Sequence, residues 1–331
     1  MLRKAALALR LVLCICLMIV PLAAQAQKPA TVYRIGWLSP EAAADPFALN
    51  LLDIFEEELR ALGYVQGKNL VIDIRRAEGK NELLPGLAAE LVALKPDVIV
   101  AQTTVGTVAA KRATATIPIV MVRVSDPVGS GFIASFAHPG GNITGVTDLA
   151  LDVSAKYMEL LHLIVPKATR VAVLMSENPV TPFQLKFIQD AATSIGTTVL
   201  PLMDRSDEEL EQAFATMAKG GAEGLIVLGG SPLREQRDKI IEHTAKMRLP
   251  AIYPVRHWIE KGGLLSYGAD TRTWFKLAAH YVDKILKGAK PSDLPVEQPT
   301  KVELVINLKT AKALGITIPQ SLALRANELI Q

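Results

Sequence analysis

Short apolar runs alternate with longer amphipathic segments along most of the chain. Each run holds four to six residues and is followed by a break rich in glycine, proline or polar residues. Strands of a parallel sheet have this character, because helices cover both of their faces. We therefore expect strands at residues 33–38, 70–75, 97–101, 119–124 and 143–146, and in a second series at residues 170–175, 198–203, 224–228 and 250–253.

The segments between these runs repeat apolar residues every three or four positions, which is the period of an amphipathic helix. Residues 47–63, 82–95 and 208–221 are examples, and each ends near glycine or lysine, as helices often do. Strands that alternate with helices predict parallel sheets covered on both faces. Two successive series, in a chain longer than one core usually supports, predict an α/β protein with two doubly wound lobes.

The end of the chain departs from this alternation. Residues 273–288 have a strong helical pattern, and residues 302–308 form a late apolar run. Neither segment extends the second series. We expect a chain that crosses between the lobes more than once, so that several segments form the hinge.

The first 26 residues have the pattern of a secretory signal. A basic start at Arg3, Lys4 and Arg10 precedes the apolar run 11–22, and Ala24-Gln25-Ala26 follows as a small-x-small cleavage site. The run is short for a membrane span, although an uncleaved anchor is the alternative. We expect residues 1–26 to be removed and the remaining chain to be exported to the periplasm.

The chain that follows the signal lacks cysteine and carries no net charge, which limits the kinds of site and partner it can have. The two cysteines, Cys14 and Cys16, lie inside the signal, so disulfides, thiolate metal sites and a cysteine nucleophile are excluded. The signal also carries three basic and no acidic side chains, which accounts for the formal net charge of +3. A neutral chain without a long basic run does not favour nucleic acid as a partner.

Motifs for catalysis or cofactor binding are sparse. Gly129-Ser130-Gly131 lacks the third glycine of a dinucleotide fingerprint, and no glycine-rich loop ends in Gly-Lys-Ser or Gly-Lys-Thr. There is no G-x-S-x-G elbow, and the five histidines are scattered without an H-x-x-x-H pair. We expect a protein that is not an enzyme and that binds neither a cofactor nor a metal ion.

Four of the expected strand ends share one chemistry. They read Ser39-Pro40, Ser125-Asp126-Pro127, Asn178-Pro179 and Ser231-Pro232. One interpretation is structural, because serine, asparagine and aspartate cap helices and proline favours the first helical position. The other is functional, because open α/β sheets bind ligands at the carboxyl ends of their strands, where helix N-termini offer free N–H groups. Both interpretations stay open from the residues alone.

Aromatic residues raise the same question. Trp37 ends the first strand, and Tyr253 and Tyr267 lie near strand ends in the second half of the chain. They either pack in the core or line a cleft, where the rings would stack on a flat ligand or bind an ammonium group. Trp258 and Trp274 lie in helical segments and are predicted to be packing residues.

Four blocks of the sequence resemble one family. Residues 63–79, 111–121, 126–146 and 295–319 are similar to the substrate-binding proteins of ABC transporters related to the tryptophan/tyrosine-binding group. The resemblance covers essentially the whole chain after the signal. It implies a type I periplasmic-binding fold, in which two Rossmann-like lobes, joined by three chain crossings, hold a ligand between them. The implied lobes are residues 31–146 with 266–296, and residues 147–265 with 297–331.

The resemblance also implies where a ligand would be bound, namely by the strand-end loops that face the cleft. The candidates in the first lobe are Trp37, Ser39, Gln102, Thr103, Thr104, Ser125 and Asp126. The candidates in the second lobe are Thr147, Asn178, Ser231, Tyr253, Tyr267 and Asp270. The hydroxyl and N–H groups of residues 102–104 could hold a carboxylate, and Asp126 could pair with an amine. Many relatives have a Gly-Thr-Pro-type turn where this chain has Gln102-Thr103-Thr104, so the identity of the ligand does not transfer.

The implied function is that of a receptor for a small, amino acid-like ligand, with an aromatic or branched side chain as the first expectation. Ligand binding would shift a hinge equilibrium towards a closed form, which the permease of an ABC importer in the inner membrane would recognise. No covalent chemistry is implied, and the protein is expected to act as a monomer. The alternative is a sensor that delivers a signal to a membrane receptor.

Overall fold

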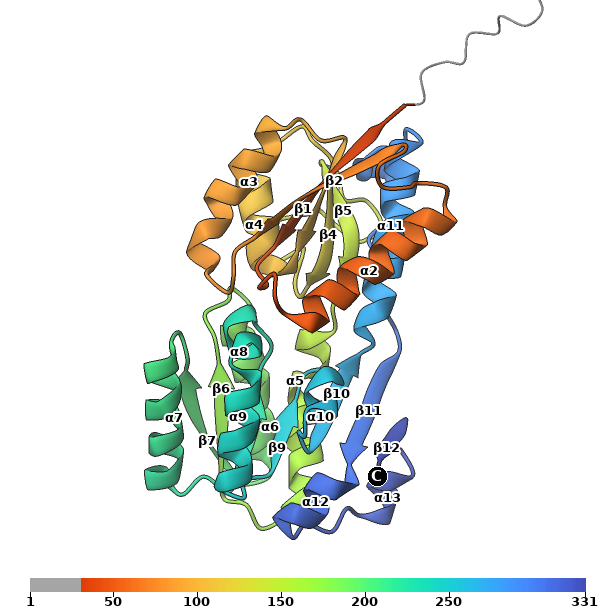
Figure 1. The fold of residues 1–331 in the computed structure, drawn as a ribbon. Helices are drawn as coiled ribbons and strands as arrows, with labels where there is room; N and C mark the ends of the chain where they lie inside the picture. The colour runs from red at the N-terminus through yellow and green to blue at the C-terminus, as the bar shows by residue number, and fades with distance from the viewer. Residues whose placement is uncertain (1–30) are drawn as a thin grey trace, which may run out of the picture. The chain divides into compact units, whose positions relative to one another are not determined.

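Two β-sheets, each covered by helices, make up residues 31–331, the part of the chain that the computed structural model describes (Figure 1). The predicted signal at residues 1–26 lies outside these residues. The first sheet contains five parallel strands in the order β2-β1-β3-β4-β5, and we call it, with its helices, the first lobe. Its strands are β1 Tyr33–Ser39, β2 Leu70–Arg76, β3 Val98–Gln102, β4 Ile119–Val124 and β5 Ile143–Thr147.

The second sheet contains seven strands in the order β12-β11-β10-β9-β8-β6-β7, and we call it, with its helices, the second lobe. Strands β11 and β12 run against the others, because β10 and β11 pair in the antiparallel direction. The strands are β6 Arg170–Met175, β7 Thr198–Met203, β8 Gly224–Val227, β9 Ala251–Tyr253, β10 Leu265–Ala269, β11 Val302–Asn307 and β12 Glu328–Ile330. The two doubly wound sheets confirm the predicted α/β fold.

Helices lie on both faces of each sheet. In the first lobe α2 (Pro46–Ala61) and α11 (Thr271–Leu286) pack on one face, and α3 (Leu84–Ala93) and α4 (Thr103–Ala113) pack on the other. In the second lobe α5 (Ala150–Ile164) and α6 (Thr181–Ser194) lie opposite α7 (Asp207–Gly220) and α9 (Arg237–Lys246). The short helices are η2 Asn81–Leu83, α8 Ser231–Glu235, α10 His257–Glu260, η3 Pro291–Asp293, α12 Leu308–Leu314 and α13 Gln320–Ala323. From residue 31 onwards, no helix has both the length and the apolar character needed to span a membrane.

Alternate residues of the central strands enter opposite cores of the first lobe. Val98 and Val100 of β3 pack with α2 and α11, whereas Ile99 and Ala101 pack with α3 and α4. All four side chains are fully buried. Burial of a side chain such as valine or isoleucine contributes about 1.5–3 kcal/mol. A strand that is covered on both faces therefore needs a continuous apolar run, and this explains why the sequence predicted these strands.

The chain passes between the lobes three times: after β5, between β10 and α11, and between η3 and β11. Two of these crossings lie side by side. The amide of Thr147 donates to the carbonyl of Glu297 at 2.9 Å, and the amide of Glu297 donates to the carbonyl of Gly145 at 3.0 Å. Bending between the lobes is therefore expected to concentrate in a few short, paired segments.

The position of β10 differs from the expectation that the first lobe resumes at residue 266. β10 pairs with β9 and β11 of the second sheet, and α11, the next element, packs on α2 in the first lobe. The strands expected from the sequence do not include β10, because Ser266 and Gly268 interrupt its apolar pattern, although Tyr267 was placed near a strand end. We propose that the first lobe resumes at α11, so that this crossing lies at residues 269–271.

A buried carboxylate at the end of β7 gives the second lobe a dependence on pH. Asp204 is fully buried. Burial disfavours the charged form and raises the pKa of Asp204 from the ordinary 3.8 to about 6, a shift that Gln236 opposes only in part. The folded protein therefore holds this proton more tightly than the unfolded chain does. The charge destabilises the fold above about pH 6, and the penalty disappears as the pH falls towards about 4.

We expect the Asp204→Asn variant to be more stable than the wild-type protein at about pH 7.5, by on the order of 2 kcal/mol. The amide keeps the shape of the side chain and carries no charge. The difference should shrink as the pH is lowered through the pKa of Asp204, and urea denaturation of both proteins over this range measures it. Equal stability at neutral pH, or a difference that does not vary with pH, would contradict the expectation.

Candidate functional site

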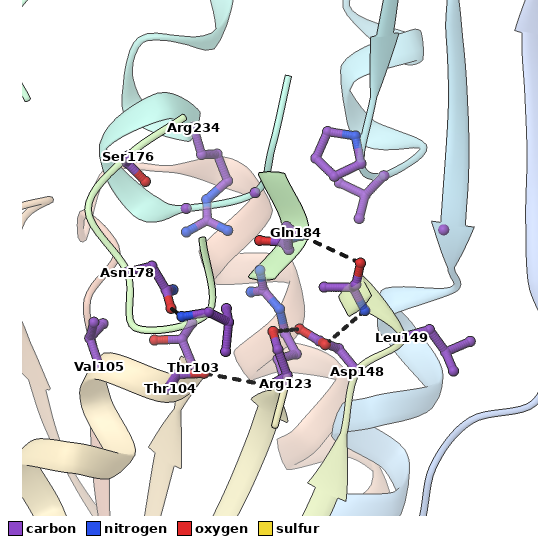
Figure 2. Close-up of a pocket in the computed structure, with 18 of the residues that line it drawn as sticks. Thr103, Thr104, Val105, Arg123, Asp148, Leu149, Ser176, Asn178, Gln184 and Arg234 are labelled. Carbon is purple, nitrogen blue, oxygen red and sulfur yellow. Dashed lines mark hydrogen bonds between the residues drawn. The ribbon is translucent and has the colours of Figure 1, made fainter. Parts of the chain in front are cut away.

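A cavity lies where the carboxyl-terminal ends of strands from both sheets meet (Figure 2). It encloses about 1010 Å³ of empty space, counting the part that is open to solvent. Much of its wall is apolar, with three aromatic side chains, Tyr157, Trp258 and Trp274. Since side chains of both lobes line it, a bound molecule would bridge the lobes.

Two residues that line the cavity have strained backbone conformations. Thr103, at the start of α4, has a φ angle of 64°, and Arg123, near the end of β4, has a φ angle of 62°. A positive φ is a genuine outlier for a β-branched residue, and such conformations cost about 1–3 kcal/mol each and cluster at functional sites. At Arg123 the register between β4 and β5 also shifts, between Val122 and Val124. A bulge of this kind redirects a side chain, here into the cavity.

The guanidinium group of Arg123 is held by a buried carboxylate. Its Nη1 atom lies 2.8 Å from Oε1 of Glu41, and the group stacks over the ring of Trp274, with Cζ 5.5 Å from the ring centroid. Glu41 is fully buried. Burial by itself raises the pKa of Glu41, but Arg234 and Arg123 outweigh it together and hold the pKa below its usual value. Glu41 therefore carries its negative charge at neutral pH.

A second carboxylate, that of Asp148, lies in the cavity wall where the chain first crosses between the lobes. The hydroxyl of Ser125 donates to its Oδ2 at 3.0 Å, and the amide of Ala150 donates to its Oδ1 at 3.0 Å (Figure 2). Burial raises the pKa of Asp148, although these two hydrogen bonds and the charge of Arg123 oppose the shift. A cationic group that entered the cavity would favour the charged form of Asp148.

The second lobe contributes uncharged polar groups beside the charged residues Glu177 and Arg234. The side-chain oxygen of Asn178 accepts a hydrogen bond from the amide of Val180 at 3.1 Å. Gln184 of α6 donates from Nε2 to the carbonyl of Ala150 at 3.4 Å. Figure 2 places Asn178 and Gln184 around the same space as Asp148. These groups can orient a polar ligand without adding charge.

Four of the candidates predicted from the sequence line the cavity, namely Thr103, Thr104, Ser125 and Asn178. Thr104 accepts a hydrogen bond from the amide of Ser125 at 3.4 Å, so the loops after β3 and β4 brace each other. The hydroxyl of Thr103 is buried and has no hydrogen-bond partner among residues 31–331. A ligand oxygen or nitrogen could supply that partner. Contact of these four residues with a ligand stays a prediction.

Three other candidates are buried and form hydrogen bonds that lead to Glu41. The hydroxyl of Ser39 donates to Oε2 of Glu41 at 3.3 Å. With its amide assigned so that nitrogen faces the carboxylate, Gln102 donates to the same oxygen at 3.0 Å and accepts from Nε1 of Trp37 at 2.9 Å. Trp37 itself is fully buried between Phe55 and Phe275. These residues position a charged group of the site and are not among those that line the cavity.

Five of the remaining candidates occupy structural positions and are not among the residues that line the cavity. Asp126 accepts a hydrogen bond from the amide of Gly129 at 2.8 Å, and Asp270 caps α11 by accepting from the amide of Arg272 at 3.0 Å. The other three are Thr147, in a crossing; Tyr253, buried against Trp258; and Tyr267, within β10. The last candidate, Ser231, is the first residue of α8, and its side chain lies outside the described part of the structure. Their predicted binding roles stay predictions, and their positions favour the structural interpretation.

The charged residues of the cavity were missed from the sequence. Arg123 lies inside an apolar run that predicts a buried strand, and a lone charge there was the available signal. Asp148 follows Thr147 directly, and Arg234 follows the Ser231-Pro232 turn. Trp258 and Trp274 are buried, as the packing interpretation predicts, but they also form part of the cavity wall.

Comparison with known proteins finds that the chain is similar to members of one family. Residues 46–330 match the family model described as ABC transporter substrate binding protein. A tyrosine-binding protein of Clostridioides difficile (strain R20291) is 29% identical over 264 residues, which are 79% of this chain and 75% of that protein.

Solved structures of similar proteins agree with this result. A conserved domain protein of Vibrio cholerae has a TM-score of 0.83 and 26% identity, over 90% of this chain and all of that one. An ABC domain of Streptococcus pneumonia in complex with L-Trp has a TM-score of 0.82 and 25% identity, over 91% of this chain and all of that one. A ligand-free, open substrate-binding protein of Clostridium difficile, also 25% identical over 91% of this chain and all of that one, has a TM-score of 0.64. At equal sequence identity, this chain is therefore more similar to the ligand-bound structure.

Proposed function

This chain belongs to the family of ABC transporter substrate-binding proteins, and from that premise we propose that it binds an L-amino acid with an aromatic or other large apolar side chain. The cavity between the lobes is the proposed binding site. The similarity to a tyrosine-binding protein and to a protein in complex with L-Trp supports this class of ligand.

The observation that carries the proposal is a pair of opposite charges in a cavity whose wall also holds aromatic and other apolar side chains. Arg123 and Asp148 both line it, and they lie close enough for each to influence the pKa of the other. An amino acid presents a carboxylate and an ammonium group on one carbon atom. In the proposed arrangement the carboxylate binds Arg123, the ammonium group binds Asp148, and the apolar side chain packs on Tyr157, Trp258 and Trp274.

We further propose that the protein acts in the periplasm and presents its ligand to the permease of an importer in the inner membrane. Membership of the family supports this role. The protein would then perform no covalent chemistry. Its contribution would be the difference in free energy between open and closed arrangements of the lobes, which ligand binding shifts.

Titration calorimetry with L-tryptophan and L-tyrosine tests the proposed ligand class, with protein freed of bound molecules by unfolding and refolding. We expect one of the two to bind. Tryptamine lacks the carboxylate and indole-3-propionate lacks the ammonium group, so each should bind at least about tenfold more weakly than L-tryptophan, a loss of about 1.4 kcal/mol. A buried charge left without its partner is the cause of that loss.

Two results would contradict the proposal. One is the absence of binding by either amino acid, together with a co-purified molecule of another class in native mass spectrometry. The other is equal affinity for L-tryptophan and indole-3-propionate, which would remove Asp148 as the partner of an ammonium group.

A further inference from the structure

Glu41 connects the two lobes. It lies in the loop after β1, and its Oε1 atom is 2.8 Å from Nη1 of Arg123 in the first lobe and 2.7 Å from Nη2 of Arg234 in α8 of the second lobe. The exposed fraction is 0% for the Glu41 side chain, 13% for Arg123 and 5% for Arg234. Two guanidinium groups from different lobes thus share one oxygen of a fully buried carboxylate.

The other oxygen of Glu41 is bound within the first lobe. Ser39 donates to Oε2 at 3.3 Å and Gln102 donates to it at 3.0 Å. Glu41 therefore keeps three partners of its own lobe, Ser39, Gln102 and Arg123, if the lobes separate. Its contact with Arg234 is the one that separation would break.

Neighbouring contacts join the same two segments. The amide of Ala42 donates to Oε1 of Glu235 at 3.1 Å. Nε of Arg234 lies 3.6 Å from Oδ2 of Asp45. The ring of Phe47 stacks on His257 of α10 with centroids 4.7 Å apart. Residues 41–47 of the first lobe therefore form one continuous contact with α8 and α10.

We propose that Glu41 is a positioning residue that couples occupation of the cavity to closure of the lobes. Arg123 meets the ligand on one side and Glu41 on the other, and Glu41 in turn holds Arg234 of the second lobe. Breaking a buried ion pair is costly because it leaves an uncompensated charge, so the pair favours the closed arrangement. The ligand affinity then depends on Glu41, because apparent affinity scales with the fraction of protein in the binding-competent state. This inference rests on the proposed function only where it concerns the ligand.

The test compares Glu41→Gln with the wild-type protein by small-angle X-ray scattering without ligand and by titration with L-tryptophan. Glutamine keeps the size of the side chain and removes the charge. We expect a larger radius of gyration for the unliganded variant and an affinity at least about tenfold lower. Arg234→Gln, which removes the partner in the other lobe, should give the same two changes and keeps the test independent of how well Glu41→Gln folds.

Arg237→Gln is the matched control. Arg237 is also a buried arginine of the second lobe, but its ion pair is with Asp238 in its own helix. Its replacement should leave the radius of gyration unchanged.

The double variant Glu41→Gln/Arg234→Gln separates coupling from direct contact of Arg234 with the ligand. If Glu41 acts through Arg234, the affinity of the double variant for L-tryptophan should be no lower than that of the single variant that binds more weakly. The inference would be overturned if the losses of binding free energy in the two single variants added up in the double variant. It would also be overturned if the affinity fell while the radius of gyration stayed at the wild-type value. Since scattering needs no ligand, expanded variants together with a wild-type protein that binds neither amino acid would refute the proposed ligand class and leave the coupling intact.

Discussion

The Arg123→Met variant is expected to bind the amino acid at least about a hundredfold more weakly than the wild-type protein, since removal of one partner of a buried charge pair costs about 2–5 kcal/mol. Methionine can still cover the ring of Trp274, which Arg123 covers in the structure. It cannot pair with a carboxylate. Titration calorimetry with L-tryptophan measures the loss.

Two control variants make the result specific. Arg123→Lys keeps the charge but loses the planar group that can bind Glu41 and a ligand together, so its affinity should lie between those of the wild-type protein and the methionine variant. Arg248 shares the left-handed backbone of Arg123, with a φ angle of 50°, but it is exposed. Arg248→Met should bind normally. If Arg123→Met binds within about threefold of the wild-type protein, a difference below 1 kcal/mol, Arg123 is not the partner of the carboxylate.

Gly145→Ala is expected to lower the stability of the fold by about 4 kcal/mol, from a strained backbone and an overpacked sheet together. Gly145 lies within β5 with a φ angle of 134°. A methyl group there would lie 2.2 Å from the carbonyl oxygen and 2.8 Å from the amide nitrogen of Met121 in β4. Both are backbone atoms, so relief requires the two strands to separate.

Urea denaturation of Gly145→Ala beside Gly141→Ala measures this effect. Gly141 has no atom within 4 Å of the position that a methyl group would take. Its substitution should change stability by no more than about 0.5 kcal/mol. Equal midpoints for the two variants would show that β4 and β5 tolerate the added group, contrary to the expectation.

The sheets could be predicted because burial on both faces leaves a plain signal in the sequence. Strands such as β3 are continuous apolar runs, since one set of alternate residues packs on α2 and α11 and the other set packs on α3 and α4. The same reasoning fails for β10, where Ser266 and Gly268 replace apolar residues. It also fails for β12, which is only three residues long.

Prediction of the site was limited by the direction in which side chains point. Polar residues directly after a strand were found, and Thr103, Thr104 and Ser125 do line the cavity. Trp37 also lies near a strand end, but the alternation along β1 turns it into the core. Arg123 was missed because its orientation depends on a bulge and a positive φ angle, which result from the pairing of β4 with β5. Such tertiary features have no local signature in the sequence.

The second crossing has a consequence for the order in which the parts of the chain can fold. Helix α11, which contributes Trp274, Phe275 and Tyr281 to the core beneath the first sheet, is synthesised only after β6 to β10 of the other sheet. Until residue 286 has emerged, the strands from β1 to β5 present an apolar face that α2 alone covers. An apolar face that is exposed for this long attracts chaperones and favours aggregation. Neither lobe can therefore complete its fold until the late segments of the chain are present, because the first lobe needs α11 and the second needs β11 and β12.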